Sequence, residues 1–144
     1  MLFACAHNSG RSQMASAFFN AFCAPNLVKA VSAGTSPVAR VQPEVLQAMD
    51  EIGFDVDARH QLLTHELAKS ADLLVTFAGC GLGEGMNGKR RIEWSVPDTE
   101  GQPLEQVRRI RDELRRKIWR LIAKEGWYKL QPASAMRPTA AQGT

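Results

Sequence analysis

The sequence predicts an α/β protein in which helices cover both faces of a mainly parallel β-sheet. Two observations support this class. Apolar segments with strand character alternate with segments of helical spacing along most of the 144 residues. In addition, residues 72–78 (DLLVTFA) are almost continuously apolar, as expected for a strand with both faces covered by helices. We expect this run to be a central strand.

The first strand and helix open the chain. Residues 1–4 form a short apolar run that ends at Cys5, and the following AHNSG favours a turn. Apolar side chains then recur at helical spacing from Ser12, and Pro25 with Asn26 ends that helix. The chain therefore begins with a strand, a tight loop and a helix.

The next elements lead to the central strand. A second strand is expected over residues 27–33, where Gly34 stops it. Helical spacing predicts a helix over 43–52, and a short helix over 64–70 precedes the central strand. The first two predicted strands are thus each followed by helical sequence.

The last two elements are a short strand at 92–94 and a long helix over 103–124. Apolar residues recur in this helix at spacings of three and four, which predicts one face packed on the sheet. The arginines fall on the other side. Although 13 of the 18 Lys/Arg residues lie in 89–144, we interpret the basic side as a solvated helix face, so a nucleic-acid partner is not expected.

Length and composition restrict the class further. A chain with 44% hydrophobic residues and this length fits one domain, placed at residues 1–130, with a polar, flexible tail over 131–144. No apolar stretch of about 20 residues predicts a membrane span, and no secretory leader is visible. Three cysteines, an odd number, argue against a disulfide scaffold. We expect a cytoplasmic protein with reduced thiols.

The loop between the first strand and the first helix carries the candidate chemistry. Its sequence, CAHNSGRS over residues 5–12, puts a thiol at the end of a strand and an arginine at the start of a helix. A loop this short must curl, so its backbone N–H groups converge and the first helical turn adds unpaired donors. The expected oxyanion-binding residues are Asn8, Ser9, Gly10, Arg11 and Ser12.

Cys5 is the candidate nucleophile of this loop. Arg11 can offer two N–H groups to a tetrahedral anion, and its charge favours the thiolate form of Cys5. Ser12 could hydrogen-bond the thiolate or a departing sulfur. The alternative for Cys5 is a buried small residue that ends a strand. His7 stays open between the rim of the site and an ordinary loop position.

Several motifs occur in an order and at a spacing typical of one family. They are FACAHNSGRSQMASAFFN, VSAGT at Val31, RVQPEV at Arg40, LLVTFAGCG at Leu73, VPDTEGQP at Val96 and VRRIRDEL at Val107. Over nearly all of residues 1–125, the chain resembles arsenate reductases that share the fold of low-molecular-weight protein tyrosine phosphatases. The resemblance implies a three-layer sandwich with a four-stranded parallel sheet and an acid from a later loop.

The resemblance assigns the acid role to Asp98, which would transfer a proton at the bound oxyanion. In the family this aspartate precedes a proline, whereas here Thr99 follows it, so the rigidifying proline is absent. Phosphatase members usually continue with tyrosines that hold a phosphotyrosine ring. The only tyrosine of this chain is Tyr128, which disfavours a tyrosine phosphatase.

Reduction of arsenate needs two electrons, so a second thiol must resolve the adduct on Cys5. Cys23, at the far end of the first helix, is expected to be structural, whereas Cys80 follows the central strand at the sheet edge where the Cys5 loop emerges. Thioredoxin-coupled family members carry two cysteines in that region, but this chain has one. We expect a Cys5–Cys80 disulfide reduced by a thioredoxin- or glutaredoxin-like partner, or attack by a small thiol such as glutathione or mycothiol. In the alternative, Cys80 has no role.

The main hypothesis is thus an arsenate reductase of arsenical resistance, with phosphate and sulfate as competing anions and no bound cofactor. No metal site is expected, because Ser16 stands where some family members carry an acidic potassium ligand. One alternative is a small phosphatase that uses Cys5, Arg11 and Asp98. The other is a non-enzymatic oxyanion-binding or nucleic-acid-associated protein.

Overall fold

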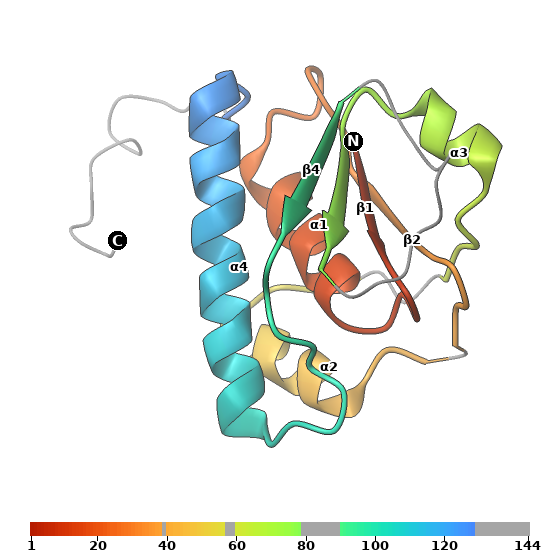
Figure 1. The fold of residues 1–144 in the computed structure, drawn as a ribbon. Coiled ribbons are helices and arrows are strands. Elements are labelled where there is room, and N and C mark those ends of the chain that lie inside the picture. The colour runs from red at the N-terminus through yellow and green to blue at the C-terminus, as the bar shows by residue number, and fades with distance from the viewer. Residues whose placement is uncertain (39, 57–59, 79–89, 129–144) are drawn as a thin grey trace, which may run out of the picture.

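The computed structural model describes residues 1–38, 40–56, 60–78 and 90–128. Its centre is a parallel sheet in the order β2-β1-β3-β4 (Figure 1). The strands are β1 (Leu2–Cys5), β2 (Val31–Gly34), β3 (Leu74–Phe77) and β4 (Arg91–Trp94). The helices are α1 (Arg11–Phe22), α2 (Pro43–Asp50), α3 (His65–Ser70) and α4 (Leu104–Glu125). The predicted fold class and the interior position of β3 are confirmed.

Alternating side chains of the strands build two separate cores. Phe3 and Val75 point into the larger core, formed with α1, α2 and α4. Leu2 and Leu74 point into a smaller core on the opposite face, which α3 covers. The sheet is therefore the middle of three layers, and all strands run toward the same edge (Figure 1).

The second strand is shorter than the sequence predicts. The strand expected over 27–33 begins only at Val31, because the amides of Leu27 and Val28 bond back to the carbonyl of Ala24. The Asn20 side chain holds both backbone polar groups of Ala30, each at 2.9 Å. A turn after α1 thus includes residues that strand propensity alone would assign to the strand. Residues 131–144, expected to form the tail, lie outside the described residues.

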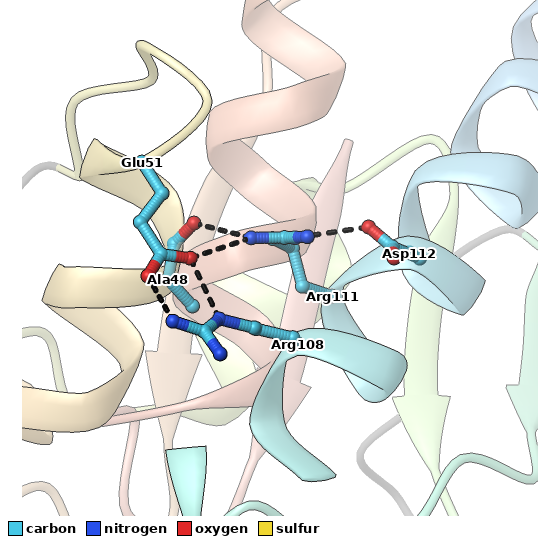
Figure 2. A network of polar contacts seen from close by, with 5 residues as sticks. All are labelled: Ala48, Glu51, Arg108, Arg111 and Asp112. Atoms are coloured by element: carbon cyan, nitrogen blue, oxygen red, sulfur yellow. Dashed lines mark hydrogen bonds and ion pairs between the residues drawn. The ribbon is translucent and has the colours of Figure 1, made fainter. Parts of the chain in front are cut away.

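Arg111 corrects the expectation that the arginines of α4 lie on a solvated face. The residue is only 8% exposed, and its Nη1 donates to the carbonyl of Ala48 near the end of α2 at 2.8 Å. Glu51 contacts both Arg111 and Arg108, and Asp112 accepts from the Nε of Arg111 (Figure 2). These contacts of Arg108 and Arg111 therefore hold the end of α2 against α4.

Glu51 provides a pH-dependent test of that network. The hydrogen bond from Arg108 holds the pKa of Glu51 below its ordinary value of 4.5. A carboxylate with a lowered pKa stabilises the fold above its unfolded-state pKa, and this stabilisation disappears as pH falls through the folded-state value. We expect Glu51→Gln to lower the Tm by about 2–5 °C at pH 7, and the difference from the wild type to shrink below about pH 4.5.

Thermal unfolding followed by circular dichroism at pH 7, 5 and 3 measures this difference. Glu105→Gln is the matched control, since Glu105 pairs with Arg109 on the same helix and both side chains are exposed. That variant should leave the Tm nearly unchanged. A Tm difference for Glu51→Gln that is equal at pH 7 and pH 3 would contradict the assigned role.

No helix among the described residues combines the length and the apolar character that crossing a membrane requires.

Candidate active site

The loop between β1 and α1 points its backbone carbonyls away from its centre. Five consecutive carbonyls accept hydrogen bonds from outside the loop, four of them from the amides of the segment after β2. The pairs are Cys5 O with Thr35 N at 3.2 Å, Ala6 O with Ser36 N at 2.7 Å, His7 O with Val38 N at 3.1 Å, Asn8 O with Gln13 Nε2 at 3.0 Å and Ser9 O with Gln42 N at 3.0 Å.

The backbone amides of the same loop differ from its carbonyls. Within the described part of the chain, the amides of residues 6–10 donate to no acceptor. Opposite orientation of N–H and C=O across each peptide turns these donors toward the interior of the loop, where the first turn of α1 adds more. These donors can bind an anion, and the binding of an anion by residues 5–12 stays a prediction.

Asn8 is the residue that gives the loop its curvature. It is completely buried and has a φ of 53°, in the left-handed region that few residues other than glycine adopt. Its Oδ1 accepts from Ser12 Oγ at 3.0 Å and from Gln13 Nε2 at 3.3 Å. The Asn8 side chain thus shapes the loop from within, while its backbone amide is among the donors that face the interior of the loop.

The end of β2 supports the loop from behind. A Cβ at Gly34 would lie 2.6 Å from the carbonyl oxygen of Ala6 and 2.9 Å from the amide nitrogen of Asn8. Only glycine permits this approach. Gln42 adds a second contact, because its Nε2 donates to Ser9 Oγ at 3.2 Å. Ser9 therefore contacts the neighbouring segment with its side chain.

The thiol of Cys5 lies against the first turn of α1. Its Sγ is 2.9 Å from Ser12 Oγ, and the residue is buried. When Cys5 is a thiol, its S–H group donates to Ser12 Oγ. The single hydroxyl proton of Ser12 is then donated to Asn8 Oδ1. When Cys5 is a thiolate, that proton must turn to the sulfur, and Gln13 still satisfies Asn8. Ser12 can therefore stabilise the ionised nucleophile without leaving Asn8 Oδ1 unpaired.

Arg11 begins α1 and is nearly buried between three elements. Its Nη1 donates to the carbonyl of Val96 at 2.7 Å, and its guanidinium lies 5.3 Å from the centre of the Phe77 ring. Val96 follows β4, and Phe77 ends β3. The tertiary structure therefore holds the guanidinium in one orientation beside the loop.

Asp98 lies within reach of Arg11 on the loop between β4 and α4. One carboxylate oxygen is 3.9 Å from Arg11 Nη2, and the other accepts from the amide of Glu100 at 3.1 Å. The Asp98 side chain is 57% exposed. A cavity of 520 Å³ adjoins both residues. It is lined by Arg11, Ala78, Ser95, Val96, Pro97, Asp98 and Glu113.

Several contacts of the site were not predicted from the residue pattern. His7 Nδ1 lies 3.0 Å from Glu100 Oε1, which joins the anion loop to the Asp98 loop and places His7 at the rim. Gln13, Gln42 and Glu113 were also missed. Gln42 and Glu113 carry no spacing signal, because they reach the site from distant segments, whereas Gln13 contacts Asn8 only five residues away.

The two other cysteines differ in what the structure says of them. Cys23 is buried at the far end of α1, with its Sγ 3.4 Å from the carbonyl of Val28, which agrees with a structural role. Cys80 lies outside the described residues. The strand before it, β3, is parallel and adjacent to β1, so the chain leaves β3 at the edge that bears the anion loop. Whether Cys80 takes part stays a prediction.

The buried Cys5 is followed by a loop whose carbonyls face outward and by an arginine at the start of a helix. This arrangement is typical of cysteine-dependent enzymes that act on oxyanions. The sequence profile of the family described as low molecular weight phosphotyrosine protein phosphatase matches residues 1–126. The chain belongs to this family.

Several relatives of the chain are arsenate reductases. The glutaredoxin arsenate reductase of Synechocystis is 30% identical over 86% of this chain and 96% of its own length. The arsenate reductase structure from Archaeoglobus fulgidus is 27% identical, with a TM-score of 0.74 over 85% of this chain and 98% of that one. A thioredoxin-dependent arsenate reductase structure from Corynebacterium glutamicum is 30% identical, with a TM-score of 0.68 over 85% of this chain and 59% of that one.

Proposed function

We propose that this protein is an arsenate reductase in which Cys5 attacks arsenate bound by the loop of residues 6–12. The observation that carries the proposal is the row of outward-facing carbonyls, which leaves the amides of residues 6–10 for a tetrahedral anion. The arsenate reductases among its relatives support the substrate. Phosphate and sulfate have the same shape and would compete.

In the first step the Cys5 thiolate forms a bond to arsenic, and one arsenate oxygen leaves. Asp98, placed 3.9 Å from Arg11, would give that oxygen a proton so that it departs as water. Arg11 and the loop amides would stabilise the negative charge on the remaining oxygens. Ser12 would release the sulfur from its hydrogen bond as the sulfur–arsenic bond forms.

In the second step another thiol attacks the sulfur of Cys5. A disulfide forms, and arsenite leaves with the electron pair of the sulfur–arsenic bond, so that two electrons pass from the thiols to arsenic. Cys80 is the thiol of this chain that we propose for the step. An external thiol then reduces the disulfide, or attacks in place of Cys80. The relative named glutaredoxin arsenate reductase and the structure described as a thioredoxin-dependent arsenate reductase support an external thiol system, with mycothiol as a further candidate.

The location proposed for this reaction is the cytoplasm, where thiol systems keep cysteines reduced. The buried, unbridged Cys5 and Cys23 fit such a compartment.

Turnover with separate thiol systems tests the function. Purified protein is given arsenate with thioredoxin and its reductase, with glutaredoxin and glutathione, or with mycothiol, and arsenite release is measured. We expect one system to support turnover at least tenfold above the others. Hydrolysis of p-nitrophenyl phosphate is measured beside it. Phosphate-ester cleavage without arsenite release in any system would replace the reductase with a phosphatase that uses the same Cys5.

Cys80→Ser tests the second thiol, with Cys23→Ala as the matched control. If Cys80 resolves the adduct, its replacement should lower turnover with a protein reductant by a factor of about 100 or more, while Cys23→Ala changes it little. Undiminished turnover in Cys80→Ser would show that the external thiol attacks Cys5 directly.

A further inference from the structure

We propose that Thr99 positions Asp98 by packing on the anion loop at Gly10. This inference rests on the proposed function, because it assigns a purpose to the placement of Asp98. Thr99 occupies the position at which other family members carry a rigidifying proline after the aspartate. The structure contains a contact of Thr99 that can replace that rigidity.

Thr99 is buried in an otherwise exposed turn. It is 1% exposed, whereas the side chains of Asp98 and Glu100 on either side are 57% and 59% exposed. The chain therefore inserts one side chain of this turn into the protein. An inserted residue holds its neighbours because they cannot move without withdrawing it.

The inserted side chain meets the anion loop at Gly10. A Cβ at Gly10 would lie 2.2 Å from Thr99 Oγ1, so the hydroxyl occupies the space that any other residue at position 10 would need. Gln42 Nε2, which also donates to Ser9, would be 3.2 Å from the same Cβ. Thr99 thus packs against the backbone of the loop beside the contact that Gln42 makes.

Shape explains this contact better than hydrogen bonding does. Thr99 Oγ1 is buried and has no hydrogen-bond partner in the described part of the protein. An unpaired buried hydroxyl costs free energy, so the position gains from the volume of the side chain and loses from its polarity. Valine, which has the same shape, should therefore serve as well as threonine.

The other contacts of Asp98 leave it free to move with its turn. The bond from the Glu100 amide, and that from the Gln102 amide to the Thr99 carbonyl, both lie within the turn. Asp98 is 3.9 Å from Arg11, and the His7–Glu100 pair is exposed to solvent. Exposed pairs contribute little positional restraint. Arg11 Nη1 holds the carbonyl of Val96, which precedes Asp98, and the packing of Thr99 is the buried contact that holds the turn on the other side of Asp98.

Thr99→Ala tests this role against a matched control, Thr76→Ala. Thr76 is also 1% exposed with an unpartnered hydroxyl, but it lies within β3. Both variants lose the same atoms from a buried site. We expect Thr99→Ala to lower kcat for arsenate reduction about tenfold with KM changed less than about twofold, and Thr76→Ala to change only the Tm. Thr99→Val should retain kcat within about a factor of two.

A double-mutant cycle separates positioning from a structural effect. If Thr99 acts through Asp98, then Thr99→Ala should lower kcat little further in an Asp98→Asn background. An equal tenfold loss in that background would overturn the proposal. So would a Thr99→Val variant as slow as Thr99→Ala, because the hydroxyl itself would then be acting.

Hydrogen exchange at the Glu100 amide gives a readout that needs no turnover. This amide donates to Asp98, so its protection reports where the carboxylate lies. We expect its exchange to accelerate several-fold in Thr99→Ala and to stay unchanged in Thr76→Ala. Unchanged exchange in Thr99→Ala would overturn the positioning role. Faster exchange in a protein that reduces no arsenate would overturn the function and leave the positioning role standing.

Discussion

Replacing Cys5 with serine is expected to lower arsenate reduction by a factor of about 10⁴ or more. The serine hydroxyl is a poor nucleophile near neutral pH, and its oxygen cannot form the disulfide that carries the electrons away. The side chains are close in size, so the new hydroxyl can keep the contact that Cys5 Sγ makes with Ser12 at 2.9 Å. The loss should therefore be chemical, with the fold retained.

Anion binding and arsenite release should separate in this variant. The donors of the loop are backbone amides, so Cys5→Ser should still bind phosphate or arsenate in calorimetric titration, within about tenfold of the wild-type Kd. Arsenite release measured in the same preparation should be absent. A variant that binds the anion and still reduces more than about 1% as much arsenate as the wild type would remove Cys5 from the role of nucleophile.

The second large effect is expected for Arg11→Lys, which should lower kcat/KM for arsenate by a factor of about 100 to 1000. Lysine keeps the positive charge and loses the planar group with its parallel N–H donors. Arg11 is held by the carbonyl of Val96 at 2.7 Å and by the ring of Phe77, and a shorter ammonium group could not satisfy both positions. The change therefore tests geometry at constant charge.

Arg109→Lys is the matched control for this measurement. Arg109 is an exposed arginine of α4 whose carboxylate partner, Glu105, lies one turn away. Its replacement should leave kcat/KM within about twofold of the wild type. If Arg11→Lys lost less than about fivefold, charge alone would explain the contribution of Arg11, and the fixed orientation would have no catalytic value.

The elements of the fold could be predicted because their signals are local. The apolar run at 72–78 and the three-and-four spacing in 103–124 reflect which side chains must leave water, and they correspond to β3 and α4. Cys5 and Arg11 were predicted for the same reason, since the loop, its strand and its helix are adjacent in the chain. The family resemblance added Asp98, which residue spacing alone does not connect to the loop.

Contacts between distant segments could not be predicted in this way. Arg111 has the helical position of a solvated residue, but α2 ends beside it and buries it against Ala48 and Glu51. Thr99 reads as the loss of a rigid proline, whereas its insertion against Gly10 supplies a new restraint. In both cases the partner lies dozens of residues away, so no local pattern records it.

The sequence by itself determined a three-layer α/β protein with a thiol and an arginine at the two ends of one tight loop. Backbone sterics, helix periodicity and burial of apolar side chains act over a few residues, and they suffice for that much. Only the tertiary structure decided that the loop carbonyls face outward to Thr35, Ser36, Val38 and Gln42, and that Arg11 meets Asp98. Those contacts depend on where the sheet brings separate segments together, and they orient the loop that we propose as the anion site.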